Sequence, residues 1–345
     1  MRAATAVCAV VIVFLASSPR ALTLRVPGNC ATIQGAIDLA TNGDTILVAP
    51  GSYGGTAAIV FDTKGNVRLV SEAGRAVTAI VGALELMNSN KIVVSGFTIA
   101  GGVGIICSGG TVVRDCAISN STGSGIVITH CPAGAYSDAT IVGNIIHDSF
   151  THGVEGDLSG GEAAISGNEI SGNGASGISI THSYCHISSN VIRDNGANGI
   201  SVSLCTAFIL RNTIVRNAGA GVRFATGGSA FDERISGSIV ALNRASGLSG
   251  EPGGTYFVAC CDVWGNGAPA GLDYAGAIAD QTGTGGNISA DPLFCSPSSN
   301  DFSLLIGSPA LAQSCGEMGA FTEITCERPE ATRTTTWGRI KTPYR

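Results

Sequence analysis

Short runs of alternating apolar and polar residues recur along the chain, separated by glycine and asparagine turns. In Ile178-Ser179-Ile180 every second side chain is apolar, the pattern of a β-strand with one buried face. Segments beginning at residues 167, 189 and 211 align without gaps, so the period is 22 residues, and looser copies begin at 115 and 143. The unit reads N-x-[IV]-x-x-N-x-x-x-G-[IVL] and contains two such runs. A constant period of this kind predicts a solenoid.

No unit is long enough to hold a crossover helix, and its runs are too short to pair with each other as hairpins. Each strand therefore has to pair in parallel with the equivalent strand one repeat later, and such connections are right-handed. The sequence predicts an all-β fold, a single-stranded right-handed parallel β-helix of about ten coils with a short N-terminal capping helix. At about 4.8 Å per coil, the rod would be about 50 Å long.

Equivalent positions in successive coils define columns along the rod. One column is apolar and predicts the core: Ile118, Ile146, Ile170, Ile192, Ile214 and Val240. Two asparagine columns stand beside it, and asparagine at a turn hydrogen-bonds backbone groups and tolerates left-handed dihedral angles, so we expect structural ladders. The first ladder contains Asn144, Asn168, Asn190 and Asn212, and the second contains Asn173, Asn195, Asn217, Asn243 and Asn266.

Both ends of such a rod need a cover, because the terminal strands have unpaired edges. Thr32 can cap a short helix over residues 33–41, whose apolar face would plug the open end. Residues 45–48 would then begin the first coil. Residues 291–294 and 301–304 are expected to close the other end.

Composition and charge exclude several classes of protein. Of 345 residues, 49 are glycine, 44% are hydrophobic and only 13% are charged. This apolar content is too high for a disordered chain, and glycines without a three-residue period exclude collagen. A net charge of -6 does not provide the basic surface that phosphate contacts require, so we expect no nucleic-acid partner.

The first 21 residues have the features of an export signal. Arg2 precedes an apolar run from residue 3 to residue 16, small residues follow, and we expect cleavage after Ala21. The run is too short to cross a membrane, and we expect no transmembrane span in the mature chain. The sequence thus divides into a signal peptide (1–21), a β-helix domain with its caps (22–326) and a basic flexible tail (327–345). Export implies a periplasmic, cell-surface or secreted protein.

Cysteine use fits an exported protein. Of the 12 cysteines, Cys8 leaves with the signal and 11 remain, an odd number that leaves at least one thiol unpaired in a monomer. No CxxC pair is present and the histidines are not spaced as zinc ligands, so we expect disulfides. The connectivity stays open, and Cys315 with Cys326 is the first pair to test.

The opening NCATIQGAIDLATNGDTILVAPGSYGG, the NxIxxNxxxG[IV] repeats and the closing DPLFCSPSSNDFSLLIGSPALAQSCGEMGAF resemble secreted bacterial right-handed parallel β-helix proteins of the pectate-lyase-like superfamily. The resemblance covers roughly residues 28–321 and implies the fold. Its implication for function is broad, because that superfamily contains polysaccharide lyases, hydrolases, epimerases, carbohydrate binders, adhesins and periplasmic accessory proteins. The motifs of polygalacturonase-like hydrolases and mannuronan epimerases are absent from the repeats.

Charge is segregated along the predicted rod. No Lys or Arg occurs between Asp115 and Ile192, whereas four arginines lie between Arg193 and Arg223 with Asp194 as the only acid. If Ile178 and Ile180 point inward, the outward side chains form two columns. One column contains Glu155, Ser179, Ser201 and Arg223, and the other contains Asp157, Thr181 and Ser203.

These outward columns are the candidate ligand-binding residues. Glu155 and Asp157 become neighbours, and with Asp148 near the same turn their hard oxygen atoms would suit Ca²⁺. The alternative is that these acids only keep a glycine-rich surface soluble. His130 and His182 each end a GIxITH run, two coils apart, and are expected to cap turns.

Three functions stay open at this point. The favoured one is an exported non-catalytic protein that binds an extracellular or cell-wall polysaccharide, with acidic glycans attracted to Arg223. The second is a Ca²⁺-dependent polysaccharide lyase acting on uronic-acid polymers, with Glu155 and Asp157 holding the metal and an arginine as the base. The third is a structural or adhesive spacer. No catalytic residue is assigned, and the sequence favours a protein that is not an enzyme.

Overall fold

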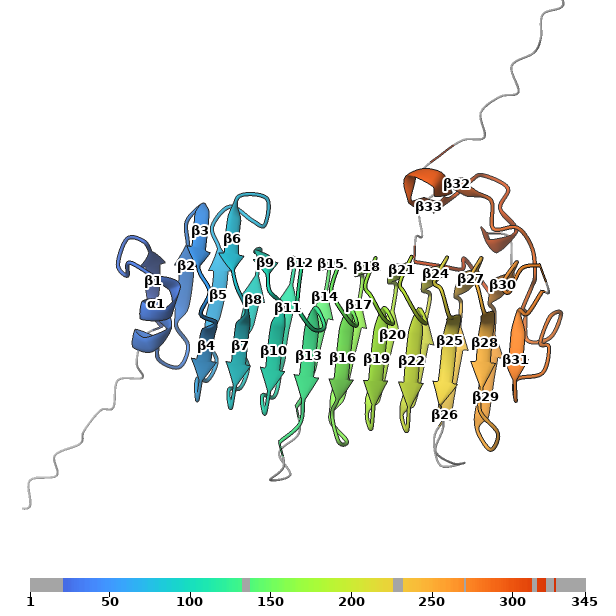
Figure 1. Ribbon diagram of the computed structural model, residues 1–345, viewed down its shortest axis with the longest axis horizontal. Coiled ribbons are helices and arrows are strands. Elements are labelled where there is room, and N and C mark those ends of the chain that lie inside the picture. The colour runs from blue at the N-terminus through green and yellow to red at the C-terminus, as the bar shows by residue number, and fades with distance from the viewer. Residues whose placement is uncertain are drawn as a thin grey trace, which may run out of the picture.

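The computed structural model describes residues 21–131, 137–225, 232–269, 271–311, 315–320 and 326. They form a parallel β-solenoid of about 11 turns with one short helix near the N-terminus, as predicted (Figure 1). The expected signal peptide, apart from Ala21, and the tail 327–345 lie outside the described residues. No helix in the described part of the chain is long and apolar enough to cross a membrane.

Each turn of the solenoid contributes one strand to each of three parallel sheets, named A, B and C here. Sheet A contains β1 (Thr23–Val26), β2 (Thr45–Val48), β5 (Arg68–Ser71), β8 (Val93–Ser95), β11 (Thr111–Arg114), β14 (Ala139–Val142), β17 (Glu162–Ser166), β20 (Tyr184–Ser188), β23 (Thr206–Leu210), β26 (Asp232–Ser236) and β29 (Thr255–Ala259). Sheet B contains β3 (Gly51–Gly54), β6 (Thr78–Val81), β9 (Thr98–Ala100), β12 (Ala117–Ser119), β15 (Ile145–His147), β18 (Glu169–Ser171), β21 (Val191–Arg193), β24 (Thr213–Val215), β27 (Ile239–Ala241) and β30 (Asp262–Trp264). Sheet C contains β4 (Ile59–Asp62), β7 (Leu84–Met87), β10 (Val103–Ile106), β13 (Ile126–Thr129), β16 (Val154–Asp157), β19 (Ile178–Thr181), β22 (Ile200–Ser203), β25 (Ala220–Ala225), β28 (Ser246–Gly250) and β31 (Tyr274–Gly276).

The sequence predicted two strands per repeat, whereas the structure has three. The strand that was missed belongs to sheet A, for example β20, with the sequence Tyr-Cys-His-Ile-Ser. Its inward residues are Cys185 and Ile187, and its outward residues Tyr184 and His186 are exposed. A cysteine and a tyrosine in this strand obscure the apolar alternation that marks sheets B and C.

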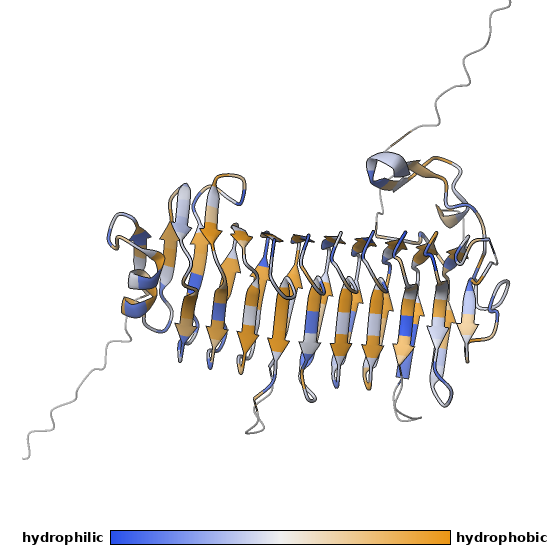
Figure 2. Cartoon of the chain, in the orientation of Figure 1, coloured by the Kyte–Doolittle hydropathy of each residue, from blue (hydrophilic) through white to orange (hydrophobic). Residues whose placement is uncertain are grey.

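The predicted core column is confirmed. Ile118, Ile146, Ile170, Ile192, Ile214 and Val240 align one above the other in sheet B, and none of them is exposed. In Figure 2 the strands alternate between hydrophobic and hydrophilic residues along their length. This is the pattern expected for strands that bury one face in a narrow interior.

Both asparagine ladders are confirmed. Each side-chain amide donates to the side-chain oxygen of the next asparagine at 2.9–3.0 Å. The first ladder ends where the Asn212 N–H donates to Ser238 Oγ at 3.1 Å, and the second where Asn266 donates to Asp273 Oδ1 at 2.9 Å. Because every member is buried, these bonds satisfy polar groups that water cannot reach.

Five cysteines of the described residues are free, and all five are buried: Cys30, Cys116, Cys185, Cys205 and Cys261. Two of them continue the first ladder. The backbone N–H groups of Cys116 and Cys261 donate to Asn144 Oδ1 and Asn287 Oδ1, both at 2.9 Å. Each thiol donates to the carbonyl two residues earlier, at 3.2 and 3.3 Å. These thiols therefore occupy turn positions that asparagine holds in other coils.

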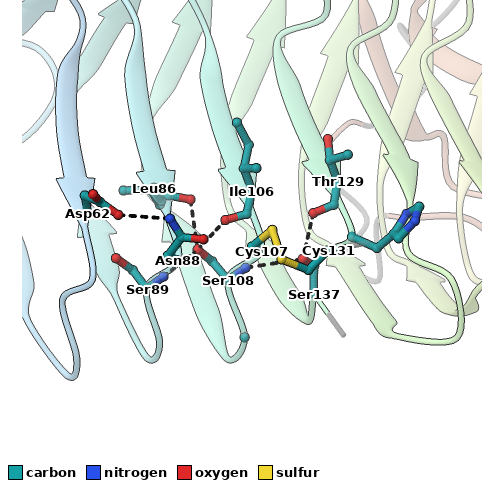
Figure 3. Close-up of a disulfide and its surroundings, with 12 residues drawn as sticks. Asp62, Leu86, Asn88, Ser89, Ile106, Cys107, Ser108, Thr129, Cys131 and Ser137 are labelled. Atoms are coloured by element: carbon teal, nitrogen blue, oxygen red, sulfur yellow. Dashed lines mark hydrogen bonds between the residues drawn. A yellow bond between two sulfur atoms is a disulfide. The ribbon is translucent and has the colours of Figure 1, made fainter. Parts of the chain in front are cut away.

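Three disulfides are present: Cys107–Cys131, Cys260–Cys315 and Cys295–Cys326. The expected pairing of Cys315 with Cys326 is wrong, because each of these residues meets a cysteine earlier in the chain. Cys107–Cys131 joins the turns that follow β10 and β13 (Figure 3). Beside it, the Ser108 N–H donates to Ser137 Oγ, and Ser108 Oγ donates to two carbonyl groups.

The N-terminal cap is helix α1 (Ile33–Leu39). Thr32 is its N-cap, accepting from the Gly35 N–H at 3.0 Å, and Ile33, Ala36 and Ile37 are buried against the core. The first strand is earlier than predicted, since β1 precedes the helix and pairs in parallel with β2. Helix α1 therefore lies between β1 and β2, within the first turn of the solenoid.

The prediction that the C-terminal segment closes the end of the rod is wrong. Residues 291–311 and 315–320, here called the clasp, include β32 (Phe294–Ser296), η1 (Pro297–Ser299), β33 (Asp301–Leu304) and η2 (Pro309–Leu311). Phe294, Phe302 and Leu304 pack with Val215 and Ile239, which belong to sheet B. Figure 1 shows β32 and β33 beyond the sheet B strands β24 and β27. The clasp therefore covers the outer, apolar face of sheet B at this end.

Candidate functional site

The predicted outward columns are present on sheet C. Register pairs join Glu155, Ser179, Ser201 and Arg223 in one column, and Asp157, Thr181 and Ser203 in the other. Ile178 and Ile180 between them are fully buried. We call these seven outward residues the polar strip.

The centre of the polar strip is a set of small hydroxyl groups on β19 and β22. Thr181 Oγ1 donates to the Gly156 carbonyl at 3.3 Å. The hydroxyl groups of Ser179, Ser201 and Ser203 have no hydrogen-bond partner within the described part of the chain. Hydroxyl groups spaced one coil apart on an open sheet can donate to and accept from a ligand that runs along the rod.

Glu155 and Asp157 lie on the same strand but lean toward opposite edges of sheet C. Glu155 Oε2 accepts from Ser124 Oγ at 2.6 Å, and Ser124 is hydrogen-bonded to Thr151 at 2.7 Å, in the turns that enter the sheet. Asp157 Oδ1 lies 3.3 Å from His182 Nδ1, in the turn that leaves it. These contacts hold the two carboxylates apart.

Asp157 stands between the two histidines that were predicted to cap turns. Its Oδ1 atom is 3.7 Å from His130 Nδ1, on the preceding coil, and 3.3 Å from His182 Nδ1, on the following coil. His130 Nδ1 is also within 3.2 Å of the Asp157 carbonyl oxygen. Sequence spacing alone placed the two histidines apart and missed the carboxylate that links them.

The expected calcium ligands do not form a cluster. Asp148 follows sheet B rather than sheet C, and its Oδ2 atom lies 2.8 Å from His147 Nδ1. Among the residues that the structure describes, no group of three or more His, Cys, Asp or Glu side chains is arranged to hold a metal ion. A calcium site at Asp148, Glu155 and Asp157 would need these side chains to move.

Three of the four arginines that follow the acidic segment are paired with acids. Arg223 binds Glu251 at 2.8 Å, and both side chains are about half exposed. Arg193 contacts Glu169 and Asp194, and Arg216 contacts the same aspartate at 2.6 Å. Burial opposes ionisation of Asp194, but hydrogen bonds from the two arginines outweigh it and lower its pKa. Arg223, which the sequence suggested as a partner for acidic glycans, is therefore already paired with a carboxylate of the chain.

Glu85 is a further acid in the Glu155 column that sequence reasoning missed. It lies on β7, and its neighbour one coil later is Gly104 on β10. The Glu85 carboxylate lies over Gly104, where a Cβ atom would collide with it. Burial raises the pKa of Glu85. The glycine in an otherwise apolar strand was the one signal that a neighbouring side chain fills this place.

Comparison with known proteins defines the class. Residues 81–235 match the family model described as the right-handed β-helix region. This match and the parallel sheets agree with the predicted right-handed parallel β-helix fold. No curated protein matches the sequence.

Several solved structures that are similar to this chain are polysaccharide lyases or epimerases. The chain superposes on pectate lyase Pel9A with a TM-score of 0.66 and 12% identity, covering 89% of this chain and 97% of that one. It superposes on the A-module of the Azotobacter vinelandii mannuronan C-5 epimerase AlgE4 with a TM-score of 0.54 and 16% identity, covering 68% of this chain and 73% of that one. It superposes on a PL6 alginate lyase in complex with a trisaccharide with a TM-score of 0.52 and 12% identity, covering 88% of this chain and 70% of that one. At these identities the likeness establishes the fold, which this chain shares with polysaccharide lyases and epimerases.

Proposed function

We propose that this chain is an exported, non-catalytic protein that binds an extracellular or cell-wall polysaccharide along the polar strip. The observation that carries the proposal is the row of small hydroxyl side chains on β19 and β22, three of which have no partner among the described residues. A glycan chain lying parallel to the rod axis would meet one pair of hydroxyl side chains on each of these two coils. The solved neighbours that act on pectin and alginate support a polysaccharide ligand.

An extracytoplasmic location fits this proposal. Three disulfides are expected in an oxidising compartment and not in the cytoplasm. The export signal proposed for residues 1–21 would deliver the chain there.

The test is binding of the mature protein to a glycan array, with product release followed on the same glycans. Binding without products supports the proposal, and the variant Ser201→Trp, which places a large side chain in the strip, should abolish it. Glycan binding that survives Ser201→Trp would contradict the proposed face. The absence of binding at millimolar oligosaccharide would leave the structural or adhesive spacer.

The lyase alternative is favoured by the solved neighbours, two of which are polysaccharide lyases. It needs a base beside a bound uronate and a cation to neutralise the carboxylate. Absorbance from unsaturated products, recorded on polygalacturonate and alginate with and without Ca²⁺, tests it directly. Products that appear only with Ca²⁺, and are lost in Glu155→Gln, would replace the binding proposal with this one.

A further inference from the structure

A small cleft opens beside the polar strip, at the corner where sheet C turns into sheet A. Its volume is about 220 Å³, and its walls come from three consecutive coils: Gly160, His182, Ser183, Tyr184, Leu204 and Thr206. Drug-sized pockets begin at about 300 Å³, so this cleft suits a group the size of one sugar ring. It is separate from the seven residues of the strip but adjoins them, because His182 directly follows Thr181.

Asp157 lies beside the histidine that lines this cleft. Asp157 Oδ1 is buried, accepts no hydrogen bond from the described residues, and lies 3.3 Å from His182 Nδ1. A carboxylate this close disfavours a lone pair on the facing nitrogen, so it favours the neutral imidazole that has its proton on Nδ1. Its Nε2 atom, at the far side of the ring, is then a hydrogen-bond acceptor with no partner among the described residues.

The charges around the cleft disfavour an anionic ligand. Asp157 lies on one side, with His130 beyond it, and Glu162 is the register partner of Tyr184 on the other, 4.0 Å from His186. No lysine or arginine occurs between residues 115 and 192 to balance these carboxylates. The half-exposed Tyr184 ring and the Leu204 side chain provide apolar surface, and the apolar face of a sugar ring packs well on such surface.

We propose that this corner cleft binds one uncharged sugar residue, whose hydroxyl group donates a hydrogen bond to His182 Nε2 while its ring packs on Tyr184 and Leu204. The inference rests on the proposed function, since the residue would belong to the glycan chain on the polar strip. It names the ligand class as neutral glycans, in contrast to the acidic glycans that the sequence suggested through Arg223. Asp157 acts here as a positioning residue.

The experiment is titration calorimetry of the full mature chain with neutral hexasaccharides (cellohexaose, xylohexaose and mannohexaose) and with hexagalacturonate. We expect at least one neutral ligand to bind at least tenfold more tightly than hexagalacturonate. His182→Ala should weaken that binding at least tenfold, and His182→Gln should restore part of it, because the glutamine oxygen can accept the same hydrogen bond. Asp157→Asn should also weaken it, because the amide no longer fixes the proton on Nδ1.

The matched control is His147→Ala, which removes a histidine that is also paired with an aspartate but lies on sheet B. This variant should bind like the unmodified protein, and melting curves check that every variant is folded. Unchanged affinity in both His182 variants, with binding lost in Ser201→Trp, would overturn the cleft and leave the proposed function intact. Tighter binding of hexagalacturonate than of all neutral ligands would overturn the cleft as well. No binding of any ligand would overturn both.

Discussion

At the scale of single residues, the interior of the rod contains a carboxyl group that the sequence does not reveal. Glu233 on β26 is fully buried, and neither of its carboxylate oxygens has a hydrogen-bond partner among the described residues. Burial, followed by the nearby Cys205 and Glu251, raises its pKa from 4.5 to about 8. The folded state thus keeps Glu233 protonated at pH values where the unfolded chain ionises it.

This difference makes stability depend on pH with a defined sign. Because the folded pKa is the higher one, the free energy of unfolding should fall as the pH rises from about 4.5 to about 8, by at most about 1.4 kcal/mol per unit of pKa shift. Glu233→Gln removes the ionisable group. Its melting temperature, relative to the unmodified protein, should therefore rise between pH 5 and pH 9.

The control for this measurement is Glu162→Gln, at an acid whose side chain is 61% exposed. Its melting temperature relative to the unmodified protein should stay constant over the same range. A Glu233→Gln difference that is equal at pH 5 and pH 9 would show that Glu233 is not protonated in the folded protein.

At the scale of elements, a charged substitution destabilises the fold much more at an inward position of a strand than at an outward one. Ile192 stacks between Ile170 and Ile214 with no exposed surface. Ile192→Asp places an unpaired carboxylate there, and burying a charge without a partner costs several kcal/mol. We expect loss of soluble secretion. Ser179→Asp, on the outward face of β19, should be secreted normally, and equal losses in both variants would contradict the register.

The asparagine ladders tie neighbouring coils together at their turns. Asn195 donates to Asn217 Oδ1 at 2.9 Å and to the Ile170 carbonyl at 3.2 Å, and it accepts from Asn173. Asn195→Ala removes the bonds to the Ile170 carbonyl and from the Asn173 backbone N–H, at a cost of about 1–3 kcal/mol for each buried group left unsatisfied. Chemical denaturation should show this loss. Asn42→Ala, which removes one exposed hydrogen bond to Asn66, should change stability by less than about 0.5 kcal/mol.

The sequence predicted the columns because a fixed period turns one residue position into a line along the rod. It could not predict which charges pair, because partners on neighbouring coils need not follow that period. Arg223 binds Glu251, which is 28 residues away and not 22. Asp157 reaches both histidines because they lie one coil before and one coil after it. Strand β20 was missed in the sequence because its inward Cys185 and outward His186 do not show an apolar alternation. Its pairing with β17 and β23 places it in sheet A.

At the scale of the whole molecule, the clasp is held to the rod by one disulfide as well as by apolar packing. Cys260–Cys315 links it to the turn after β29, and the Arg216 guanidinium lies 4.7 Å from the Phe302 ring. Replacing both Cys260 and Cys315 by serine should lower the melting temperature, since a disulfide typically contributes about 2–4 kcal/mol. It should also increase the fluorescence of a hydrophobic dye, because Val215 and Ile239 become accessible.

The double variant of Cys107 and Cys131 is the control, since that disulfide joins two turns away from the clasp. It should lower the melting temperature without increasing dye binding. Dye binding that rises equally in both variants would contradict a specific release of the clasp. Titration of thiols in the unfolded, unreduced mature chain should count five, since 11 cysteines less the six in disulfides leave that number.

The coils that begin at residues 167, 189 and 211 are equally long, so the rod is built from interchangeable units. Removing residues 189–210 would join Ser188 to Arg211 at the same point on the circumference, so each remaining asparagine would still meet its equivalent. The molecule would be shorter by about 4.8 Å, and the polar strip would lose Ser201 and Ser203 with the deleted coil. Duplication or deletion of one whole coil can thus lengthen or shorten the protein, and with it the length of ligand that the protein spans. The remaining coils would still stack on one another.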